Sequence, residues 1–387
     1  MSDTFISDNI IYIGVDDKTL DLFESQYPVP NGVSYNSYVI LDEKTVVMDT
    51  ADARVTEQWF ANLEKALDGR GVDYLVVSHM EPDHGANIWK LAERYPDMKI
   101  VGNAKTFGMI TQFFDVNLGD RKVEVKEGDT LELGQHTLQF FMAPMVHWPE
   151  VMVTYEQKEK ILFSADGFGK FGTLDVEEDW AEEAARYYLN IVGKYGASVQ
   201  GLLKKAAGLD IQMICPLHGP ILKDHLGYYI DKYQIWSTWQ PEQKGVLVAY
   251  ASIHGNTAHG AQQMAEILKN QGEANVEVMD LSRTDMSLAV RKAMYYDRMV
   301  VAAATYDGGV FPCMEEFLLH LKSKSYQKRR VGLMENGSWA PQAAKVMRGI
   351  LETMKEVEIA EPVVTMKSAA HADTVEVMKQ LAEELCK

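Results

Sequence analysis

Short apolar runs separated by polar loops mark the first part of the chain. Runs of strand length fall at residues 9–14, 38–41, 72–78, 123–125, 137–142, 160–164 and 211–214. Pro30-Asn31-Gly32 supplies turn residues between the first two runs, so this stretch is expected to form a meander. Apolar positions recur with helical spacing at 56–68, 86–95 and 180–205. The pattern predicts strands in two sets with helices outside them.

The pattern changes near residues 236–242, where apolar runs begin to alternate regularly with helical segments. Strand-like runs fall at 245–250, 276–281, 299–304, 330–334 and 362–366, and a helical segment at 370–385 follows the last of them. Regular alternation of this kind is typical of a doubly wound parallel sheet. We therefore expect two domains, 1–242 and 243–387, in an α/β protein.

Composition narrows the class of protein. The chain has 387 residues, of which 47% are hydrophobic, and this is enough for full cores in two or three domains. No apolar run is long enough to span a membrane, and residues 1–8 lack the basic and apolar regions of a secretory signal. A net charge of −18 argues against nucleic acid and anionic membranes as partners.

The number and spacing of the cysteines lead to two further expectations. The chain has only Cys215, Cys313 and Cys386, so a disulfide framework is not expected, and a reducing, cytoplasmic location is. None of them forms a Cys-x-x-Cys pair. A one-electron iron–sulfur partner would therefore be a separate protein.

The richest chemistry follows the apolar run at 72–78. The next six residues are His79-Met80-Glu81-Pro82-Asp83-His84, which include four potential metal ligands. His147, Asp166 and His218 each follow a later apolar run and precede Gly or Trp. Such strand ends are where an α/β sheet positions its chemistry. So many ligands suggest two adjacent metals, and histidine with carboxylate but no thiolate favours iron or manganese over structural zinc. His225 competes with His218 as the last ligand.

A second candidate site lies in the later alternating region. The strand at 245–250 leads into a loop with hydroxyl and small side chains and then into a helix start, which together can cradle a phosphate. The sequence is not GxGxxG, so a dinucleotide is disfavoured. Two more strand ends, after 304 and 334, carry polar and aromatic residues. The predicted cofactor contacts are Ser252, Ile253, His254, Gly255, Asn256, Thr257, Thr305, Tyr306, Asp307, Gly308, Gly309, Ser338, Trp339 and Ala340.

These motifs resemble two known folds joined in one chain. The first resembles the metallo-β-lactamase fold in its diiron form, since Glu81 stands where zinc hydrolases carry a second histidine. The second resembles flavodoxin, whose loops bind FMN. The combination resembles the A-type flavodiiron proteins along nearly the whole chain. It implies an αββα sandwich followed by a doubly wound parallel domain.

The resemblance also implies a ligand set. One iron would take His79, Glu81 and His147, the other would take Asp83, His84 and His218, and Asp166 would bridge them together with a hydroxo group or water. Tyr195 would donate a hydrogen bond close to the metal ligands.

The implied activity is reduction of dioxygen to water, of nitric oxide to nitrous oxide, or of both. FMN would supply electrons that come from an external donor, expected to be rubredoxin or, second, a reduced deazaflavin. Family members form head-to-tail homodimers, so a homodimer or a dimer of dimers is expected. Three alternatives stay open: a metal-dependent hydrolase, a flavodoxin-like electron carrier that has lost its metals, and a sensor of either gas.

Overall fold

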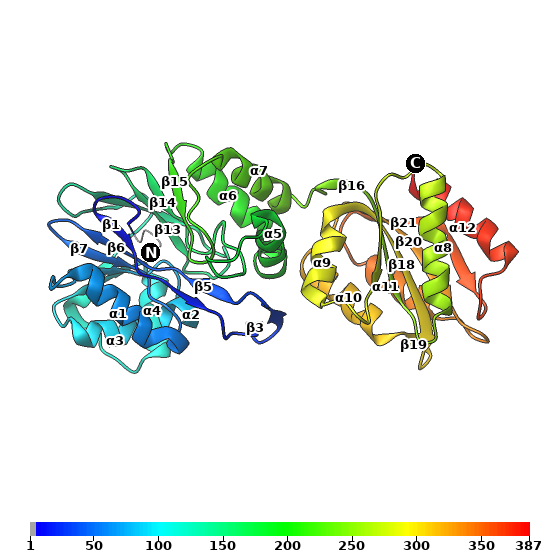
Figure 1. The fold of residues 1–387 in the computed structure, drawn as a ribbon, viewed down its shortest axis with the longest axis horizontal. Coiled ribbons are helices and arrows are strands. Elements are labelled where there is room, and N and C mark those ends of the chain that lie inside the picture. Colours follow the sequence, from blue (N-terminus) through cyan, green and yellow to red (C-terminus); the bar gives the residue numbers. More distant parts are fainter. Residues whose placement is uncertain (1–4) are drawn as a thin grey trace. The chain divides into compact units, whose positions relative to one another are not determined.

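The protein folds into two compact units (Figure 1). The computed structural model describes residues 5–387. The first unit runs to Tyr188 and resumes over Tyr195–Gln234, and the second consists of Leu189–Lys194 and Ile235–Lys387. The predicted division at 242/243 stays a prediction of where the first domain ends. Within residues 5–387, no helix combines the length and the apolar character needed to cross a membrane.

The first unit contains two large sheets. One has the strand order β1-β6-β7-β8-β9-β10 and changes from antiparallel to parallel pairing at β7–β8. Its strands are β1 Ile10–Tyr12, β6 Tyr38–Leu41, β7 Thr45–Met48, β8 Tyr74–Val76, β9 Lys99–Gly102 and β10 Lys122–Glu124. The other has the order β11-β12-β13-β14-β15, and only β14–β15 is a parallel pair. Its strands are β11 Thr130–Glu132, β12 Thr137–Met142, β13 Met152–Glu156, β14 Ile161–Phe163 and β15 Met213–Cys215.

A shared core joins the two sheets. Ile40 and Val76 of the first sheet and Phe140 and Phe163 of the second belong to one cluster of buried side chains. Short ribbons precede the sandwich: β2 Val15–Asp17 with β5 Val33–Tyr35, and β3 Leu22–Phe23 with β4 Tyr27–Pro28. The first sheet carries helices such as α1 and α4 on its outer side, and the second carries α6 and α7 (Figure 1). This arrangement confirms the predicted αββα sandwich.

Helices lie between and after these strands, and η3 and the ends of α5 and α7 extend into the segments assigned to the second unit. The helices are η1 Ala53–Val55, α1 Thr56–Leu67, α2 Pro82–Gly85, α3 Ile88–Arg94, α4 Ala104–Phe113, η2 Gly119–Arg121, α5 Trp180–Ile191, η3 Gly193–Tyr195, α6 Gly196–Ala206 and α7 Leu226–Ser237.

Two predicted helical segments, 86–95 and 180–205, are confirmed, and the structure adds a detail to each. The helix expected at 86–95 is preceded by α2, which starts inside the ligand loop because Pro82 has the φ angle of a first helical residue. The helix expected at 180–205 is divided between α5 and α6, where Gly193 and Gly196 weaken helix propensity. The sequence pattern also missed β7, β9, β11 and β13 and the helices α4 and α7.

The second unit is a five-stranded parallel sheet in the order β17-β16-β18-β20-β21, with the small β19 paired to β18. This is the flavodoxin order, so the predicted doubly wound domain is confirmed. Its strands are β16 Gln243–Ala251, β17 Val276–Asp280, β18 Tyr296–Tyr306, β19 Gly309–Val310, β20 Arg329–Asn336 and β21 Val357–Met366. Its helices are α8 Asn256–Asn270, α9 Met286–Tyr295, α10 Pro312–Ser323, α11 Ala343–Leu351 and α12 Ala372–Leu385.

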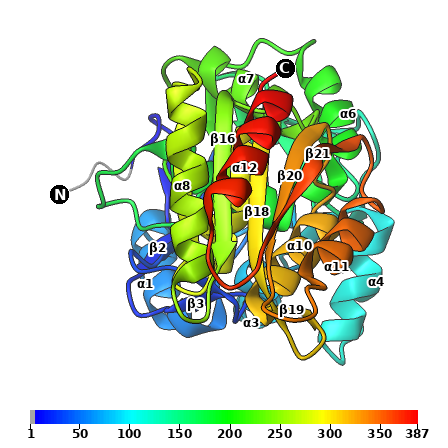
Figure 2. The same cartoon turned by 90° about the vertical axis from the view of Figure 1, so that its right-hand side faces the viewer.

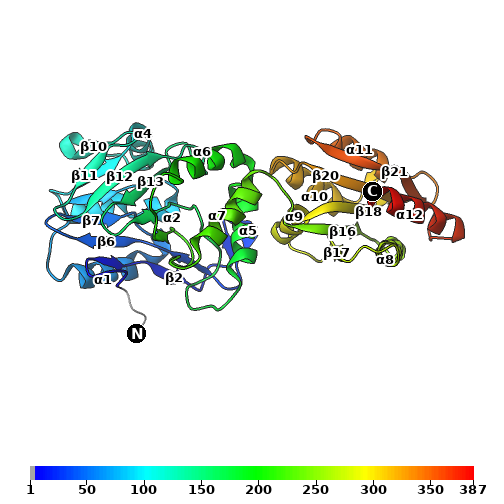
Figure 3. The same ribbon diagram turned by 90° about the horizontal axis from the view of Figure 1, so that it is seen from above.

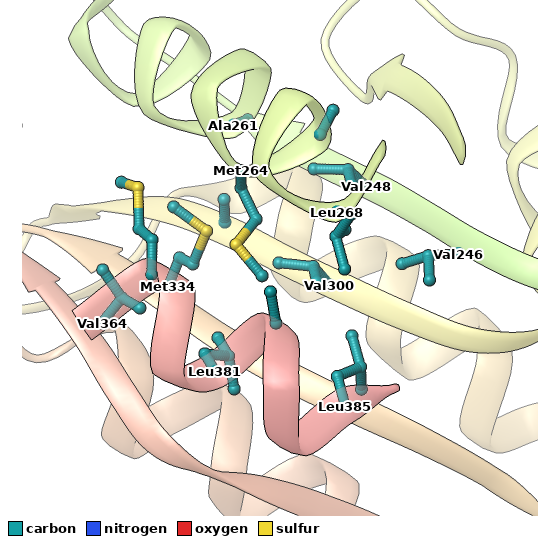
Figure 4. Close-up of a cluster of buried hydrophobic side chains, with 14 of the residues drawn as sticks. Val246, Val248, Ala261, Met264, Leu268, Val300, Met334, Val364, Leu381 and Leu385 are labelled. Atoms are coloured by element: carbon teal, nitrogen blue, oxygen red, sulfur yellow. The ribbon is translucent and has the colours of Figure 1, made fainter. Parts of the chain in front are cut away.

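Helices cover both faces of this sheet. Figure 2 shows α8 and α12 on the near face, and Figure 3 shows α11 and α8 on opposite sides of the sheet. Met264 of α8 and Leu381 of α12 meet Val300 and Met334 of the sheet in a buried cluster (Figure 4). Because all five strands are parallel, the loops after β16, β18, β20 and β21 gather at one edge of the sheet.

Candidate metal centre and flavin pocket

A buried carboxylate holds the loop after β8. Oδ1 of Asp49, which follows β7, accepts hydrogen bonds from the N–H groups of Ser78 at 2.7 Å and His79 at 3.4 Å. Burial raises the pKa of Asp49 to about 7. The loop then enters α2 at Pro82. The clamp at the strand end and the short helix together fix the backbone that carries four of the predicted ligands.

Four of the predicted ligands form the first group. His79 Nε2 lies 3.1 Å from Glu81 Oε2 and 3.4 Å from Asp166 Oδ2. His147 Nε2 lies 3.1 Å from the same Glu81 oxygen and 3.2 Å from the same Asp166 oxygen. These ligand atoms all lie within 4.8 Å of one another. Two imidazoles and two carboxylates therefore surround one point.

The second group consists of Asp83, His84 and His218. Asp83 Oδ2 lies 3.2 Å from His218 Nε2 and 3.6 Å from His84 Nε2. Each histidine places Nδ1 against a backbone carbonyl, at 2.8 Å from Ser34 for His218 and at 3.4 Å from Thr50 for His84. The hydrogen therefore belongs on each Nδ1, so both Nε2 lone pairs face each other across 3.1 Å. Two lone pairs and a carboxylate that converge in this way fit a bound cation.

Asp166 connects the two groups. Its Oδ2 belongs to the first, and its Oδ1 lies 3.8 Å from His218 Nε2 of the second. Among the described residues, Oδ1 of Asp166 and Oδ1 of Asp83 are buried and have no hydrogen-bond partner. Buried acceptors without a donor are costly. A pair of metal ions that takes these oxygens as ligands removes that cost.

The titration of these groups reflects their mutual attraction. Burial favours a raised pKa for Asp166, but the facing His79, His147 and His218 outweigh it and hold that pKa well below its usual range. Burial likewise opposes ionisation of Glu81, yet His147 and His79 lower its pKa to about 2. Burial lowers the pKa of His147, and the bonds to Asp166 and Glu81 raise it to about 9. The carboxylates thus remain charged and available as hard ligands for iron.

Aromatic rings enclose both groups. Trp148 meets the His79 ring edge-on at 5.3 Å between centroids. Phe23 lies 5.4 Å and Tyr187 lies 5.6 Å from the His218 ring. One tyrosine packed against the second group is therefore Tyr187, and the role expected for Tyr195 stays a prediction. This shell restricts water around the ligands.

The structure brings together every predicted ligand and separates the competing one. His218 is buried within the second group, whereas His225 is exposed and lies outside both groups. Three residues that were not predicted contact a ligand residue or its loop: Asp49, Ser34 and Glu150. Asp49 could have been predicted, because it directly follows an apolar run as the ligands do.

The second site is a cavity of about 580 Å³ at the carboxyl edge of the parallel sheet. Cavities of ~300–1,000 Å³ are typical of cofactor sites. Every predicted contact lines it except Gly255 and Gly309. The lining residues that the sequence analysis missed are Ala304, Asn336, Gly337, Gln342 and Ser368. Ser368 lies after β21, whose carboxyl end a parallel sheet brings to the same edge, so the topology was the available signal.

The loop after β16 fits a phosphate. Gly255 has φ +95° at the start of α8, and no side chain caps that helix. Ser252 Oγ accepts a hydrogen bond from the Gly255 N–H at 3.1 Å and so tightens the turn. The uncapped N–H groups of the helix N-terminus can bind an anion.

The opposite part of the cavity fits an aromatic ring system. Trp339 is 92% exposed and Tyr306 is 44% exposed, although both are large aromatic residues. Thr305 Oγ1 accepts hydrogen bonds from the N–H groups of Gln342 at 3.0 Å and Ala343 at 3.3 Å, and this ties the β18 loop to α11. Two exposed aromatics on anchored loops suit a planar ligand that stacks on them.

The fold and the two sites define a class: a metallo-β-lactamase-like unit with ligands for two metals, followed by a flavodoxin-like unit with a flavin-sized cavity. The ODP family beta lactamase model matches residues 33–219, and the flavodoxin domain model matches residues 247–368.

Comparisons with whole proteins agree with this class. An uncharacterised protein of Methanocaldococcus jannaschii is 31% identical, over 82% of this chain and 81% of its own. A nitric oxide reductase of Moorella thermoacetica is 28% identical, over 98% of this chain and 97% of its own. The solved rubredoxin oxygen:oxidoreductase of Desulfovibrio gigas has a TM-score of 0.93 at 26% identity, covering 99% of this chain and 97% of that chain. The chain belongs to the flavodiiron proteins, a family of oxidoreductases, and membership implies a flavin and a diiron centre.

Proposed function

We propose that this protein reduces dioxygen to water, nitric oxide to nitrous oxide, or both, at a non-haem diiron centre supplied with electrons by FMN. The observation that carries the proposal is the pair of ligand groups joined through Asp166. Relatives named as a nitric oxide reductase and as a rubredoxin oxygen:oxidoreductase support both gases as substrates.

His79, Glu81 and His147 would hold one iron, and Asp83, His84 and His218 would hold the other, with Asp166 between them. An iron pair in this site supplies two electrons and a place for both atoms of a diatomic gas. The FMN phosphate would lie at the start of α8, with the flavin ring between the loops that carry Tyr306 and Trp339.

The chain's own residues prepare the site for this chemistry. Trp148, Phe23 and Tyr187 restrict water, which strengthens electrostatic interactions within the centre. Tyr187 is buried, and burial together with Asp166 and Asp83 raises its pKa well above the usual tyrosine value. Its hydroxyl therefore keeps its proton beside the second ligand group.

Three further features belong to the proposal. A head-to-tail homodimer, alone or as a dimer of dimers, would present the FMN of one copy to the metal centre of the other, as the family resemblance implies. Rubredoxin would supply electrons, which the name of the Desulfovibrio gigas relative supports. A cytoplasmic location is supported by three cysteines without a disulfide. If light scattering shows a monomer at concentrations where the protein is fully active, the dimer proposal is wrong.

The deciding experiment uses protein loaded with iron and FMN and reduced without oxygen. Dioxygen and nitric oxide are then added separately while flavin absorbance is followed. Rapid reoxidation by either gas is expected, and the faster gas is the better substrate. Failure of both gases to reoxidise the flavin would sink the proposal.

A further inference from the structure

One buried carboxylate beside the metal centre has no role in the ligand set. Glu150 is 1% exposed and lies just before β13. Its Oε1 atom is 2.9 Å from His79 Nδ1 and 2.8 Å from the backbone nitrogen of Met80. Among the described residues, its Oε2 atom has no partner.

The geometry fixes the direction of the hydrogen bond to His79. The N–H of Met80 donates to Oε1, so this oxygen is an acceptor, and His79 Nδ1 must carry a hydrogen to bond to it. His79 Nε2, which faces Glu81 and Asp166, would then be the atom that offers its lone pair to a bound ion. A carboxylate that accepts from the outer nitrogen of a ligating imidazole fixes the ring and makes its inner nitrogen a stronger donor.

The same loop supplies a ligand of its own. Glu150 and His147 lie on the segment between β12 and β13, and Asn103 Nδ2 donates to the Glu150 carbonyl at 2.6 Å. Asn103 is fixed in turn, because its Oδ1 caps α4 by accepting from the N–H groups of Lys105 and Thr106. One anchored segment therefore provides His147 directly and orients His79 across the fold.

We propose that Glu150 is a positioning residue for the first iron: it orients His79 through Nδ1 and places a buried carboxylate behind that ligand. This inference rests on the proposed function, because it requires a metal at His79. The charge favours the ferric over the ferrous state, so its removal should raise the reduction potential of the centre.

Variants of Glu150 test the idea against a matched carboxylate. Glu156, at the other end of β13, is also buried and accepts hydrogen bonds from the N–H groups of Lys158 and Glu159. Ferrous iron is titrated anaerobically into apo-protein with a competing chelator. Glu150→Ala is expected to bind iron ~10–100-fold more weakly than wild type. Glu156→Ala is expected to bind it as wild type does. Glu150→Gln should recover most of the affinity, because its amide oxygen can still accept both hydrogen bonds.

The reduction potential gives a readout that loss of folding cannot imitate. Iron-loaded Glu150→Gln is expected to have a higher potential than wild type, and Glu156→Gln an unchanged one. The proposal is overturned if Glu150→Ala binds iron as tightly as wild type does. It is also overturned if Glu156→Ala loses as much iron affinity as Glu150→Ala. If Glu150→Ala does not fold, the Glu150→Gln potential decides alone: a rise supports the proposal and no rise overturns it. Failure of the wild type to bind iron would instead refute the proposed function.

Discussion

The two sites of this protein are built in opposite ways. In the metal centre, ligand atoms already approach to 3.1–3.4 Å, and His79 and His218 have no exposed surface. The flavin cavity is open instead, and Trp339 on its rim is 92% exposed. A small, highly charged ion needs ligands that are already in position before it binds. A planar organic cofactor can instead cover loops that are exposed in its absence. Single substitutions should therefore damage the metal centre far more than the flavin cavity.

The largest effect is expected at Asp166, which faces both ligand groups. Asp166→Asn removes the shared charge, and iron affinity should fall at least about 100-fold, beyond the loss typical of outer ligand contacts. Metal analysis of the purified variant measures this directly. Asp210→Asn, at an exposed aspartate of the same unit, is the control. Full iron content in Asp166→Asn would refute the assignment of Asp166 as the shared ligand.

Removal of each cofactor should destabilise its own unit. A ligand present at 1,000 times its dissociation constant stabilises by about 4 kcal/mol, so iron removal should lower the melting temperature of the first unit by about 10 °C. Calorimetry before and after chelation gives the shift. The transition of the flavodoxin-like unit should move only on FMN removal. A single transition that shifts equally in both treatments contradicts this separation.

A smaller effect is expected for Trp339. Trp339→Ala removes a stacking surface worth about 0.5–1.5 kcal/mol, so FMN should bind up to about tenfold more weakly. Folding stability should hardly change, because the side chain is exposed. Flavin fluorescence on titration reports the affinity. Leu319→Ala, at another exposed apolar position, should leave it unchanged, and an equal loss there would show that stacking is not involved.

The smallest effect concerns a carboxylate whose charge is balanced by a side chain instead of a metal. Burial favours a raised pKa for Asp17, but the hydrogen bonds from Arg54 at 2.7 Å and from Thr19 outweigh it and lower the pKa. A lowered folded-state pKa means that the stabilisation is present above the unfolded value of about 3.9 and is lost as pH falls below it.

Asp17→Asn should therefore cost about 1 kcal/mol at pH 7, since Arg54 is half-exposed and solvent weakens the pair. Urea unfolding at pH 7 and at pH 3 measures the difference, which should shrink at the lower pH. Iron content should not change. A cost that stays constant across this range contradicts the ionic origin of the effect.

The sequence predicted the metal ligands better than the residues that position those ligands. His79, Glu81, Asp83 and His84 are nearly consecutive, and the remaining ligands follow apolar runs, so strand ends were enough to find them. The role of Glu150 could not be predicted, because its contact with His79 spans 71 positions and depends on how the loop before β13 packs. Pattern alone likewise did not show that Pro82 starts a helix within the ligand loop.

In the flavin cavity, three loops were predictable because each follows an obvious strand and carries hydroxyl or aromatic residues. Ser368 and Gln342 were missed because their presence depends on the parallel order of the strands and on the docking of α11. The division of the helix at 192–195 was missed as well, because the apolar spacing continues across it.

In the proposed reaction, the gas reacts at the iron centre and the flavin supplies the electrons. The most direct test compares wild type with Asp166→Asn, both with full FMN and reduced without oxygen, on mixing with dioxygen or nitric oxide. Wild type should reoxidise its flavin at least about 100-fold faster with at least one gas, since iron supplies the site for both atoms of the gas. Equal rates in the two proteins would show that the flavin reacts with the gas without the metal centre, and the proposed reaction would then be wrong.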